Sequence, residues 1–289
     1  MKFALKVLLA SLVLASPASA QQNVTKILVG FAAGGPVDTV ARILSEQLGK
    51  ELGQSIVIEN KPGANASLAG NEVKKSAPDG RTLWLTSVGA AAINQFLMPN
   101  ISYTMQTDFQ PISVVVNNNE LLVVNKKNPA NSAAEFITAA KAAKEPTPMA
   151  SSGFGSIPHL AIEQLSDVTG VKFTHVAYRG AAPAINDVAS GSVAAFFGDV
   201  AGLIGNIGPE GLLKPIGLAA PKRHPGLPNV PTLDELGIKG IDTNNWYALY
   251  GPAKMDAATV AGLNTAVRNA LKHPATASKL LGLGAEPAP

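Results

Sequence analysis

The stretch Lys26-Ile-Leu-Val-Gly-Phe-Ala-Ala-Gly-Gly-Pro-Val-Asp38 indicates the fold class of this chain. Residues Lys26 to Gly30 form a short apolar run that is typical of a buried strand, and the Gly- and Ala-rich turn after it opens a helix. Gly53 stands where a C-terminal glycine cap belongs. A strand, a turn and a helix in this order predict an α/β protein. The helix carries its apolar residues on one face at helical spacing, namely Val37, Val40, Ala41, Leu44 and Leu48.

The same order of strand, turn and helix recurs along the 289-residue chain. This alternation predicts mostly parallel sheets that are covered by helices on both faces. The Pro- and Gly-rich stretch from Pro221 to Pro231 is expected to be a linker or a surface loop. We expect further strands at residues 55–59, 82–86, 112–116, 121–124, 149–152, 173–177, 192–197, 213–219 and 246–250, and helices at 66–76, 133–144, 158–169, 183–189, 257–272 and 275–281.

The first twenty residues have the three parts of a secretory signal peptide. Lys2 and Lys6 are basic, an apolar run extends from Val7 to Ala15, and Ala18-Ser19-Ala20 supplies the small residues that signal peptidase requires. The apolar run is too short to cross the roughly 30 Å of a bilayer core. We therefore predict export to the periplasm with cleavage near Ala20.

The composition excludes several classes of function. The chain has 23 basic and 20 acidic side chains and no cysteine, so it has neither disulfides nor a thiolate metal site. It lacks a basic stripe with interleaved aromatic residues, so nucleic-acid binding has no support. It also lacks a P-loop and a G-x-G-x-x-G sequence after a strand, and its four histidines lack metal-ligand spacing. We predict no metal, no cofactor and no catalytic residue.

Four strand-to-helix junctions rich in Gly, Ala and Ser are the predicted ligand site. In parallel α/β sheets, ligands bind beyond the carboxyl ends of the strands, where such junctions meet. Small residues let backbone N–H groups approach a ligand, and a helix start favours a carboxylate or a phosphate. The alternative is that Gly and Ser serve only as turn formers and helix caps. The junctions are residues 32–36, 87–91, 151–156 and 179–182.

The polar side chains near these junctions have two interpretations each. Asp38 lies in the first turn of its helix, where a carboxylate stabilises the helix start or contacts a ligand. His159 either donates to a ligand or packs between its helix and the loop. Tyr178 and Arg179 end a strand at the ligand-facing edge, where Arg179 either pairs with a carboxylate or is solvated.

Seven short motifs then occur in order along the chain. Each is weak alone, but their number, order and spacing resemble the Bug-type solute-binding proteins of tripartite tricarboxylate transporter systems, over essentially the whole mature chain. The motifs are residues 31–42 (FAAGGPVDTVAR), 57–64 (VIENKPGA), 77–83 (APDGRTL), 159–161 (HLA), 175–180 (HVAYRG), 222–232 (KRHPGLPNVPT) and 284–287 (GAEP).

The resemblance implies a two-domain periplasmic binding protein of type II, with two α/β domains, two crossing segments and a ligand between the domains. The expected ranges are 1–20 for the signal peptide, 21–122 plus 224–289 for the first domain, and 123–223 for the second. It also implies a small carboxylate ligand, bound by backbone amides, small polar side chains and water. The implied partners are the membrane permease subunits of the transporter, although some members of the family act with a sensor kinase.

The junctions and the resemblance together predict the ligand-binding residues. The chain departs from the family at Gly198, beside Asp199, where the family commonly has Asp, and at Ala201-Gly202, where it often has Pro-Ser. These departures lie at or near the cleft, so the identity of the ligand is not carried over. The predicted set is Phe31, Ala33, Gly34, Gly35, Asp38, Ser87, Gly89, Ala90, Ser151, Gly153, Ser156, His159, Tyr178, Gly180, Ala181 and Asp199.

We therefore expect a monomeric periplasmic receptor that closes over a small organic acid and passes it to a tripartite tricarboxylate-type transporter. Two other functions stay open on the sequence. One is a ligand sensor that signals through a kinase. The other is an exported α/β enzyme that uses Ser156 and His159, which are only three residues apart but have no evident orienting acid.

Overall fold

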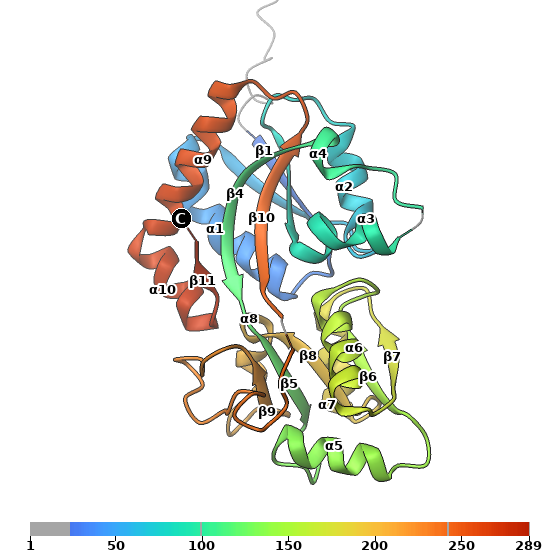
Figure 1. Ribbon diagram of the computed structural model, residues 1–289. Coiled ribbons are helices and arrows are strands. Elements are labelled where there is room, and N and C mark those ends of the chain that lie inside the picture. The colour runs from blue at the N-terminus through green and yellow to red at the C-terminus, as the bar shows by residue number, and fades with distance from the viewer. Residues whose placement is uncertain (1–23, 99, 242, 289) are drawn as a thin grey trace, which may run out of the picture.

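The structure, a computed structural model, describes residues 24–98, 100–241 and 243–288. The expected signal peptide, residues 1–20, lies outside this range. Two lobes are stacked on one another, and each is built around one sheet with helices on its faces (Figure 1). The two-domain α/β class predicted from the sequence is thus confirmed. No helix in the described part of the chain is long and apolar enough to cross a membrane.

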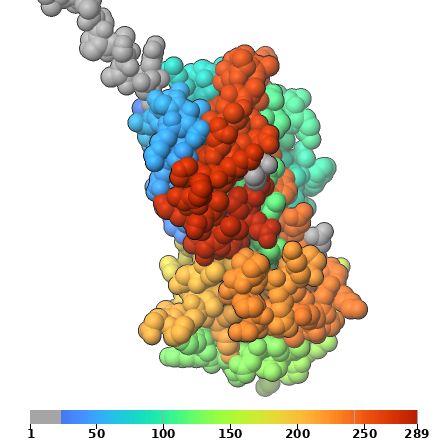
Figure 2. Space-filling view, turned by 90° about the vertical axis from the view of Figure 1, so that its left-hand side faces the viewer, coloured from blue at the N-terminus to red at the C-terminus, as the bar shows by residue number. Residues whose placement is uncertain are grey.

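The first lobe holds a six-stranded sheet in the order β11-β4-β10-β3-β1-β2. Its strands are β1 (Val24–Val29), β2 (Ser55–Asn60), β3 (Thr82–Ser87), β4 (Phe109–Asn118), β10 (Asn245–Pro252) and β11 (Glu286–Pro287). Its helices are α1 (Pro36–Leu52), α2 (Ser67–Lys74), α3 (Asn94–Leu97), α4 (Met105–Asp108), α9 (Ala257–Lys272) and α10 (Pro274–Leu283), together with a π-helical turn at Gly89–Ile93. Figure 2 shows α9 and α10 lying beside α1 on one face of this lobe.

The second lobe holds a five-stranded sheet in the order β7-β6-β8-β5-β9. Its strands are β5 (Glu120–Asn125), β6 (Thr147–Ser151), β7 (Phe173–Ala177), β8 (Ala195–Asp199) and β9 (Leu213–Ala219). Its helices are α5 (Ala133–Ala142), α6 (Ile157–Thr169), α7 (Ala181–Ser190) and α8 (Val200–Leu203), and a 3-10 turn follows at Ile204–Asn206. Apolar residues fill both faces of the sheet in two separate clusters.

Both sheets are mixed rather than mostly parallel. The pairs β1–β2, β1–β3, β6–β7 and β6–β8 are parallel, as expected for strands joined by helices. The crossover strands β10 and β5 pair antiparallel with β3 and β8. The strands β5 and β10 begin where the chain crosses between the lobes, so they run away from the cleft. Their partners β8 and β3 end at the cleft, so they run toward it. The antiparallel pairs therefore follow from the two crossings.

The second crossing lies later in the chain than the sequence analysis places it. Residues 224–241, which the expected ranges assign to the first domain, pack with the second lobe. Leu233 and Ile238 belong to a core cluster of that lobe, and Thr232 forms a parallel bridge with Leu218 of β9. The chain after β9 thus covers the second sheet before β10 begins at Asn245.

The core of the first lobe is organised around Trp84 on β3. Its ring is fully buried and meets Tyr103 edge-on at 5.7 Å between centroids. Phe109 packs against the same ring at 5.1 Å. A Cβ atom on Gly70 of α2 would lie 2.9 Å from the Trp84 ring, so glycine lets this helix approach the sheet. This packing fixes the sheet whose junctions line the cleft.

Candidate ligand-binding cleft

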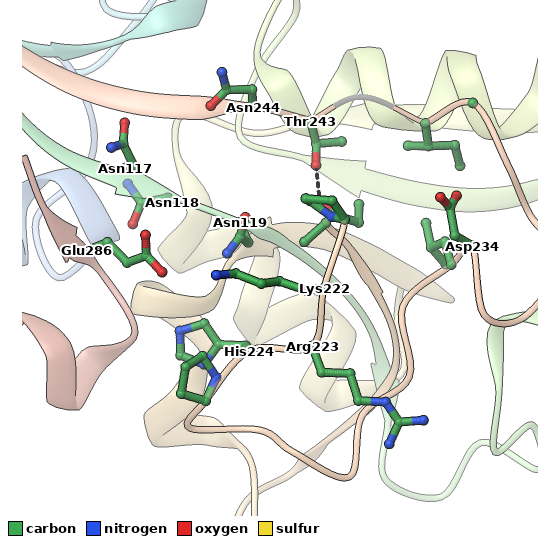
Figure 3. A pocket seen from close by; sticks show the side chains of 17 residues that line it. Asn117, Asn118, Asn119, Lys222, Arg223, His224, Asp234, Thr243, Asn244 and Glu286 are labelled. Atoms are coloured by element: carbon green, nitrogen blue, oxygen red, sulfur yellow. Dashed lines mark hydrogen bonds between the residues drawn. The ribbon is translucent and has the colours of Figure 1, made fainter.

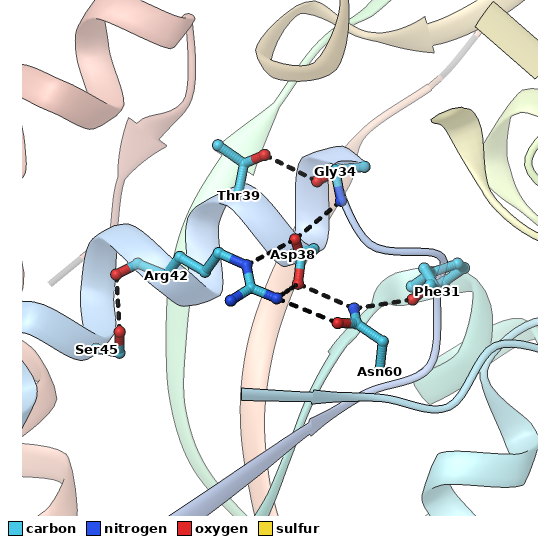
Figure 4. Close-up of polar contacts among 8 residues, drawn as sticks. Phe31, Gly34, Asp38, Thr39, Arg42, Ser45 and Asn60 are labelled. Atoms are coloured by element: carbon cyan, nitrogen blue, oxygen red, sulfur yellow. Dashed lines mark hydrogen bonds and ion pairs between the residues drawn. The ribbon is translucent and has the colours of Figure 1, made fainter. Parts of the chain in front are cut away.

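The first junction, between β1 and α1, is held by the buried carboxylate of Asp38. It accepts hydrogen bonds from the Gly34 amide (2.9 Å), from Arg42 Nε and Nη2 (both 2.9 Å) and from Asn60 Nδ2 (2.9 Å) (Figure 4). Asn60 also donates to the Phe31 carbonyl (3.1 Å). Burial alone would raise the pKa of Asp38, but the hydrogen bonds from Arg42, Gly34 and Asn60 outweigh it and lower that pKa. Asp38 therefore stabilises the loop between β1 and α1.

The second junction follows β3 and brings the first lobe against the second. Ser87 and Ala90 are buried. A Cβ atom on Gly89 would lie 3.1 Å from the carbonyl oxygen of Gly155 in the other lobe. A side chain at this position would be in tight contact with the other lobe, so glycine favours the close approach of the lobes here.

The third junction, between β6 and α6, caps its own helix. Ser156 Oγ accepts from the His159 amide (3.3 Å) and donates to the Gly153 carbonyl (2.6 Å). The Gly155 amide donates to His159 Nδ1 (3.1 Å). Ser156 is thus the N-cap of α6 rather than a nucleophile bonded to a histidine ring. Ser156, the serine of the enzyme hypothesis, is therefore not activated by the ring of His159.

Two stacked histidines support this third junction from behind. The rings of His159 and His175 lie 4.0 Å apart between centroids and are nearly parallel. Ser151 Oγ lies 2.5 Å from His175 Nε2. Burial, with a smaller contribution from His159, lowers the pKa of His175 to about 4. Burial also lowers the pKa of His159, although Glu163 opposes this. The two neutral histidine rings therefore pack the loop between β6 and α6 against β7.

The fourth junction, between β7 and α7, touches the first lobe directly. The Ala32 amide donates to the Arg179 carbonyl (3.3 Å), and a Cβ atom on Gly180 would lie 3.0 Å from the Ala32 nitrogen. Gly180 also has φ = 129°, which disfavours other residues. Tyr178 donates its hydroxyl proton to Asp187 (2.5 Å).

The crossover strands carry a buried acidic cluster at the base of the cleft. Glu120 on β5 lies directly opposite Asp199 on β8, and Asn245 Nδ2 donates to both carboxylates at 3.0 and 2.7 Å. Burial raises the pKa of Asp199 to about 6. Burial and the charge of Asp199 raise the pKa of Glu120 well above its usual value. Burial and the same carboxylate raise the pKa of the Tyr247 hydroxyl. The buried pair of acids therefore retains a proton to a higher pH than an exposed carboxyl does.

Two neighbouring cavities lie between the lobes and share Phe31 and Ser152. The inner cavity is about 20 Å³, which is room for about one water molecule. It is lined by Phe31, Pro36, Ser87, Ser152, Ser156, Ile157, Pro158, Ala181, Phe196, Asp199, Asn245 and Tyr247. The outer cavity is about 250 Å³ and is lined by Gly30, Phe31, Gly63, Ala64, Asn65, Ala66, Met98, Ser152, Gly153, Phe154, Ala177, Tyr178 and Arg179. The lobes are thus closed on one another.

The structure brings part of the predicted site together at these cavities. Phe31, Ser87, Ser156, Ala181 and Asp199 line the inner one, and Phe31, Gly153 and Tyr178 line the outer one. The other predicted residues do not line either cavity: Ala33, Gly34, Gly35, Asp38, Gly89, Ala90, Ser151, His159 and Gly180. Among these, Gly89 and Gly180 govern the approach of the lobes, and Asp38, Ser151 and His159 hold the loops.

Sequence reasoning missed the crossover residues Glu120, Asn245 and Tyr247. A signal for Glu120 existed, because an acid at the head of the apolar run Leu121 to Val124 must either be paired or share a proton. Asn245 gave no such signal, since it meets Asp199 only through the crossing of the strands. No group of three or more His, Asp or Glu side chains arranged to hold a metal ion occurs among the described residues.

Two α/β lobes joined by crossover strands, with a closed cleft lined by strand-to-helix junctions, define a periplasmic binding protein. The model of the tripartite tricarboxylate transporter family receptor matches residues 40–289, so the chain belongs to that family. It is a receptor of the binding-protein class and not an enzyme.

The relatives agree with this assignment. The chain is 32% identical to the protein BugT of Bordetella pertussis, over 95% of this chain and 85% of BugT. It is similar to the structure of MatC from Rhodopseudomonas palustris with bound malate, with a TM-score of 0.86, 32% identity and coverage of 91% and 90%. It is equally similar to the R. palustris protein Rpa4515 with adipate, with a TM-score of 0.87, 32% identity and coverage of 92% and 88%.

Proposed function

We propose that this receptor binds a small dicarboxylic acid in the cleft between its lobes and delivers it to the membrane subunits of a tripartite transporter. The observation that carries the proposal is the closed pair of cavities, the inner of which is walled by the starts of α1, α6 and α7. The starts of α1 and α7 have no side-chain cap, so they present free backbone N–H groups and the positive ends of their dipoles. Related proteins have solved structures with bound malate and with adipate, which are dicarboxylates.

The acidic cluster sets the orientation of the ligand. A carboxylate next to Asp199 and Glu120 is repelled unless the two acids retain their shared proton. The ligand carboxylates therefore bind at the junctions, and the cluster, with Asn245, contacts an uncharged or hydrogen-bonding part of the ligand. Closure of the lobes brings the junctions of both lobes onto one ligand, and ligand binding shifts the equilibrium from open to closed.

Calorimetric titration of the chain without residues 1–20 tests the ligand class. We expect at least one of malate, succinate, adipate and citrate to bind in a one-to-one complex, and glucose and putrescine not to bind. Ser152→Trp, which fills both cavities, should abolish binding, whereas Ser190→Trp at the exposed end of α7 should retain it. Binding of glucose without binding of any acid would refute the proposal.

Transport and location need separate tests. We propose cleavage near Ala20, release into the periplasm and action as a monomer. Mass spectrometry of the exported protein identifies its first residue, and sedimentation reports its mass. Uptake of the labelled acid by cells with and without the receptor separates transport from sensing. Loss of a transport receptor should abolish uptake. Loss of a sensor should change gene expression but leave uptake intact in cells whose transporter genes are already induced.

A further inference from the structure

A further cavity of the described residues lies outside the cleft. It measures about 700 Å³ and opens on the other side of the crossover strands (Figure 3). The strand order explains its place. The cleft adjoins the junctions after β1, β3, β6, β7 and β8, whereas this cavity adjoins β4 and β11 of the first sheet and the end of β9 of the second. Its volume falls within the range of small-molecule sites in proteins. We call it the hinge cavity.

The wall of the hinge cavity carries opposite charges from opposite lobes. Figure 3 shows the ammonium end of Lys222, from the loop after β9, extended toward the carboxylate of Glu286 on β11. Neither group forms a hydrogen bond or an ion pair within the residues that the structure describes. Arg223, in contrast, points away from the cavity and pairs with Glu235 at 2.9 Å. The two facing charges are therefore free for a ligand.

A buried amide in the same wall also lacks a partner. Asn118 is only 3% exposed, and neither its Oδ1 nor its Nδ2 has a hydrogen-bond partner among the described residues. Figure 3 shows its amide between Asn117 and Glu286 at the cavity wall, with Asn119 next to Lys222. Buried polar groups in proteins are normally hydrogen-bonded, so an unpaired amide here indicates a group supplied from outside the chain.

We propose that the hinge cavity is a second binding site, and that it takes a small zwitterion whose carboxylate meets Lys222 and whose ammonium meets Glu286. The charges decide the class. An anion alone would face Glu286 and Asp234, and a cation alone would face Lys222, so each is opposed by one wall. A molecule with both charges is attracted by both walls, and the asparagine amides supply its remaining hydrogen bonds.

The hinge cavity also couples its occupant to the cleft. Both lobes contribute to its wall, so an occupant that touches both Lys222 and Glu286 holds the lobes in their present closed arrangement. The occupant of the hinge cavity then raises the affinity of the cleft for the acid ligand. By linkage, the acid ligand raises the affinity of the hinge cavity for its occupant by the same factor. This coupling rests on the proposed function of the cleft, whereas binding at the hinge cavity does not.

The experiment uses ω-amino acids of increasing charge separation as probes: glycine, β-alanine, 4-aminobutyrate and 5-aminovalerate. Each is titrated calorimetrically into the chain without residues 1–20, with butyrate and butylamine as probes that carry one charge only. We expect one member of the series to bind and both single-charge probes to bind at least tenfold more weakly. Amide NMR shifts should change at Asn117 to Asn119 and at Lys222.

Matched variants locate the binding. Lys222→Gln and Glu286→Gln should each weaken the probe at least tenfold, and the double variant Lys222→Glu with Glu286→Lys should restore it, because a zwitterion can turn around. Ser152→Trp in the cleft should leave probe binding intact, which separates this site from the proposed function. The proposal is wrong if no probe binds at 10 mM, or if Ser152→Trp alone abolishes probe binding. It is also wrong if no probe binds and Lys222→Gln nevertheless changes the affinity of the cleft for its acid ligand.

Discussion

Asp199 shows how a buried charge governs this receptor at the scale of one residue. It faces Glu120 across two neighbouring strands, and the two carboxylates share the single donor Nδ2 of Asn245. Pairs of buried carboxylates without a cation reduce stability, and proteins keep them where the protonation state serves binding. The cluster is therefore expected to affect both folding stability and the pH dependence of binding.

Asp199→Asn should stabilise the protein at high pH. The folded-state pKa of Asp199, about 6, lies above the 3.8 of an exposed carboxyl. The folded state therefore holds the proton more tightly, and the contribution of this group to stability decreases as the pH rises from about 4 to about 6. The variant removes this loss and should raise the free energy of unfolding at pH 8 by about 1–3 kcal/mol. Urea unfolding at pH 5 and pH 8 measures it, with Glu210→Gln as the exposed control. If the free energy of unfolding depends equally on pH in the variant and the wild type, the raised pKa does not belong to Asp199.

The same cluster predicts proton uptake on ligand binding. A carboxylate ligand in the cleft raises the pKa of the acidic pair further, so its affinity should increase as the pH falls from 8 to 6. Calorimetry in two buffers of different ionisation enthalpy measures the protons taken up. In Asp199→Asn the uptake should be reduced, and an unchanged uptake would assign it to other groups.

Asp38→Asn should weaken the first junction. The carboxylate accepts four hydrogen bonds, two of them from the Arg42 guanidinium, and an amide cannot accept them all. We expect the free energy of unfolding at pH 7 to fall by about 2 kcal/mol. Asp167→Asn, on the exposed face of α6, is the matched control and should change stability little. If both variants behave alike, Asp38 does not hold the loop.

At the scale of elements, the lobes meet through glycines at the starts and ends of helices. Gly202 on α8 faces the side chain of Pro36 at the start of α1, and a Cβ atom there would lie 3.0 Å from Pro36 Cδ. Gly89 and Gly180 make similar approaches from the other junctions. These glycines allow closure, while the helices behind them fix where the backbone N–H groups point.

Gly202→Ala should lower ligand affinity without loss of stability. The added methyl group presses on Pro36 only when the lobes close, and alanine is the better helix former. We expect the dissociation constant for the acid ligand to increase roughly tenfold. This corresponds to a loss of about 1.4 kcal/mol of binding free energy. Gly262→Ala on α9, where a Cβ atom has no neighbour within 4 Å, serves as control. Unaltered affinity in Gly202→Ala would mean that the ligand-bound form is more open.

At the scale of the whole molecule, closure is the functional movement. The inner cavity is far smaller than a dicarboxylic acid, so a ligand enters only while the lobes are apart. The two crossover strands are the covalent connections at which the lobes turn, and the hinge cavity lies beside them on the side away from the cleft.

Ligand binding should therefore compact the protein. Small-angle scattering of the chain without residues 1–20 should show a smaller radius of gyration with saturating acid ligand than without it, because the free protein populates the open form. Ser152→Trp, which cannot hold the ligand, should give the same radius with and without the acid. An identical radius for the wild type in both conditions would mean that the free protein is already closed.

The local pattern of residues predicted most of the elements. The strands at residues 173–177 and 213–219 and the helix at 257–272 have the expected bounds, and Gly53 caps α1 with φ = 61°. Periodicity and capping act over a few residues, so the sequence reports them directly. The sequence did not predict the short helices α4 and α8, because one turn of helix carries too little pattern to distinguish it from a loop.

Local sequence patterns were enough to locate the strand-to-helix junctions and their small residues and, through the motifs, to indicate the family of receptors. The folded chain was needed to show which junction residues line the cavities and which, like Asp38 and His159, hold the loops from behind. It alone placed Glu120, Asp199 and Asn245 together and positioned Lys222 opposite Glu286. The reason is physical: these groups are between 46 and 125 residues apart or come from opposite lobes, and no local pattern encodes a contact between segments so far apart in the sequence.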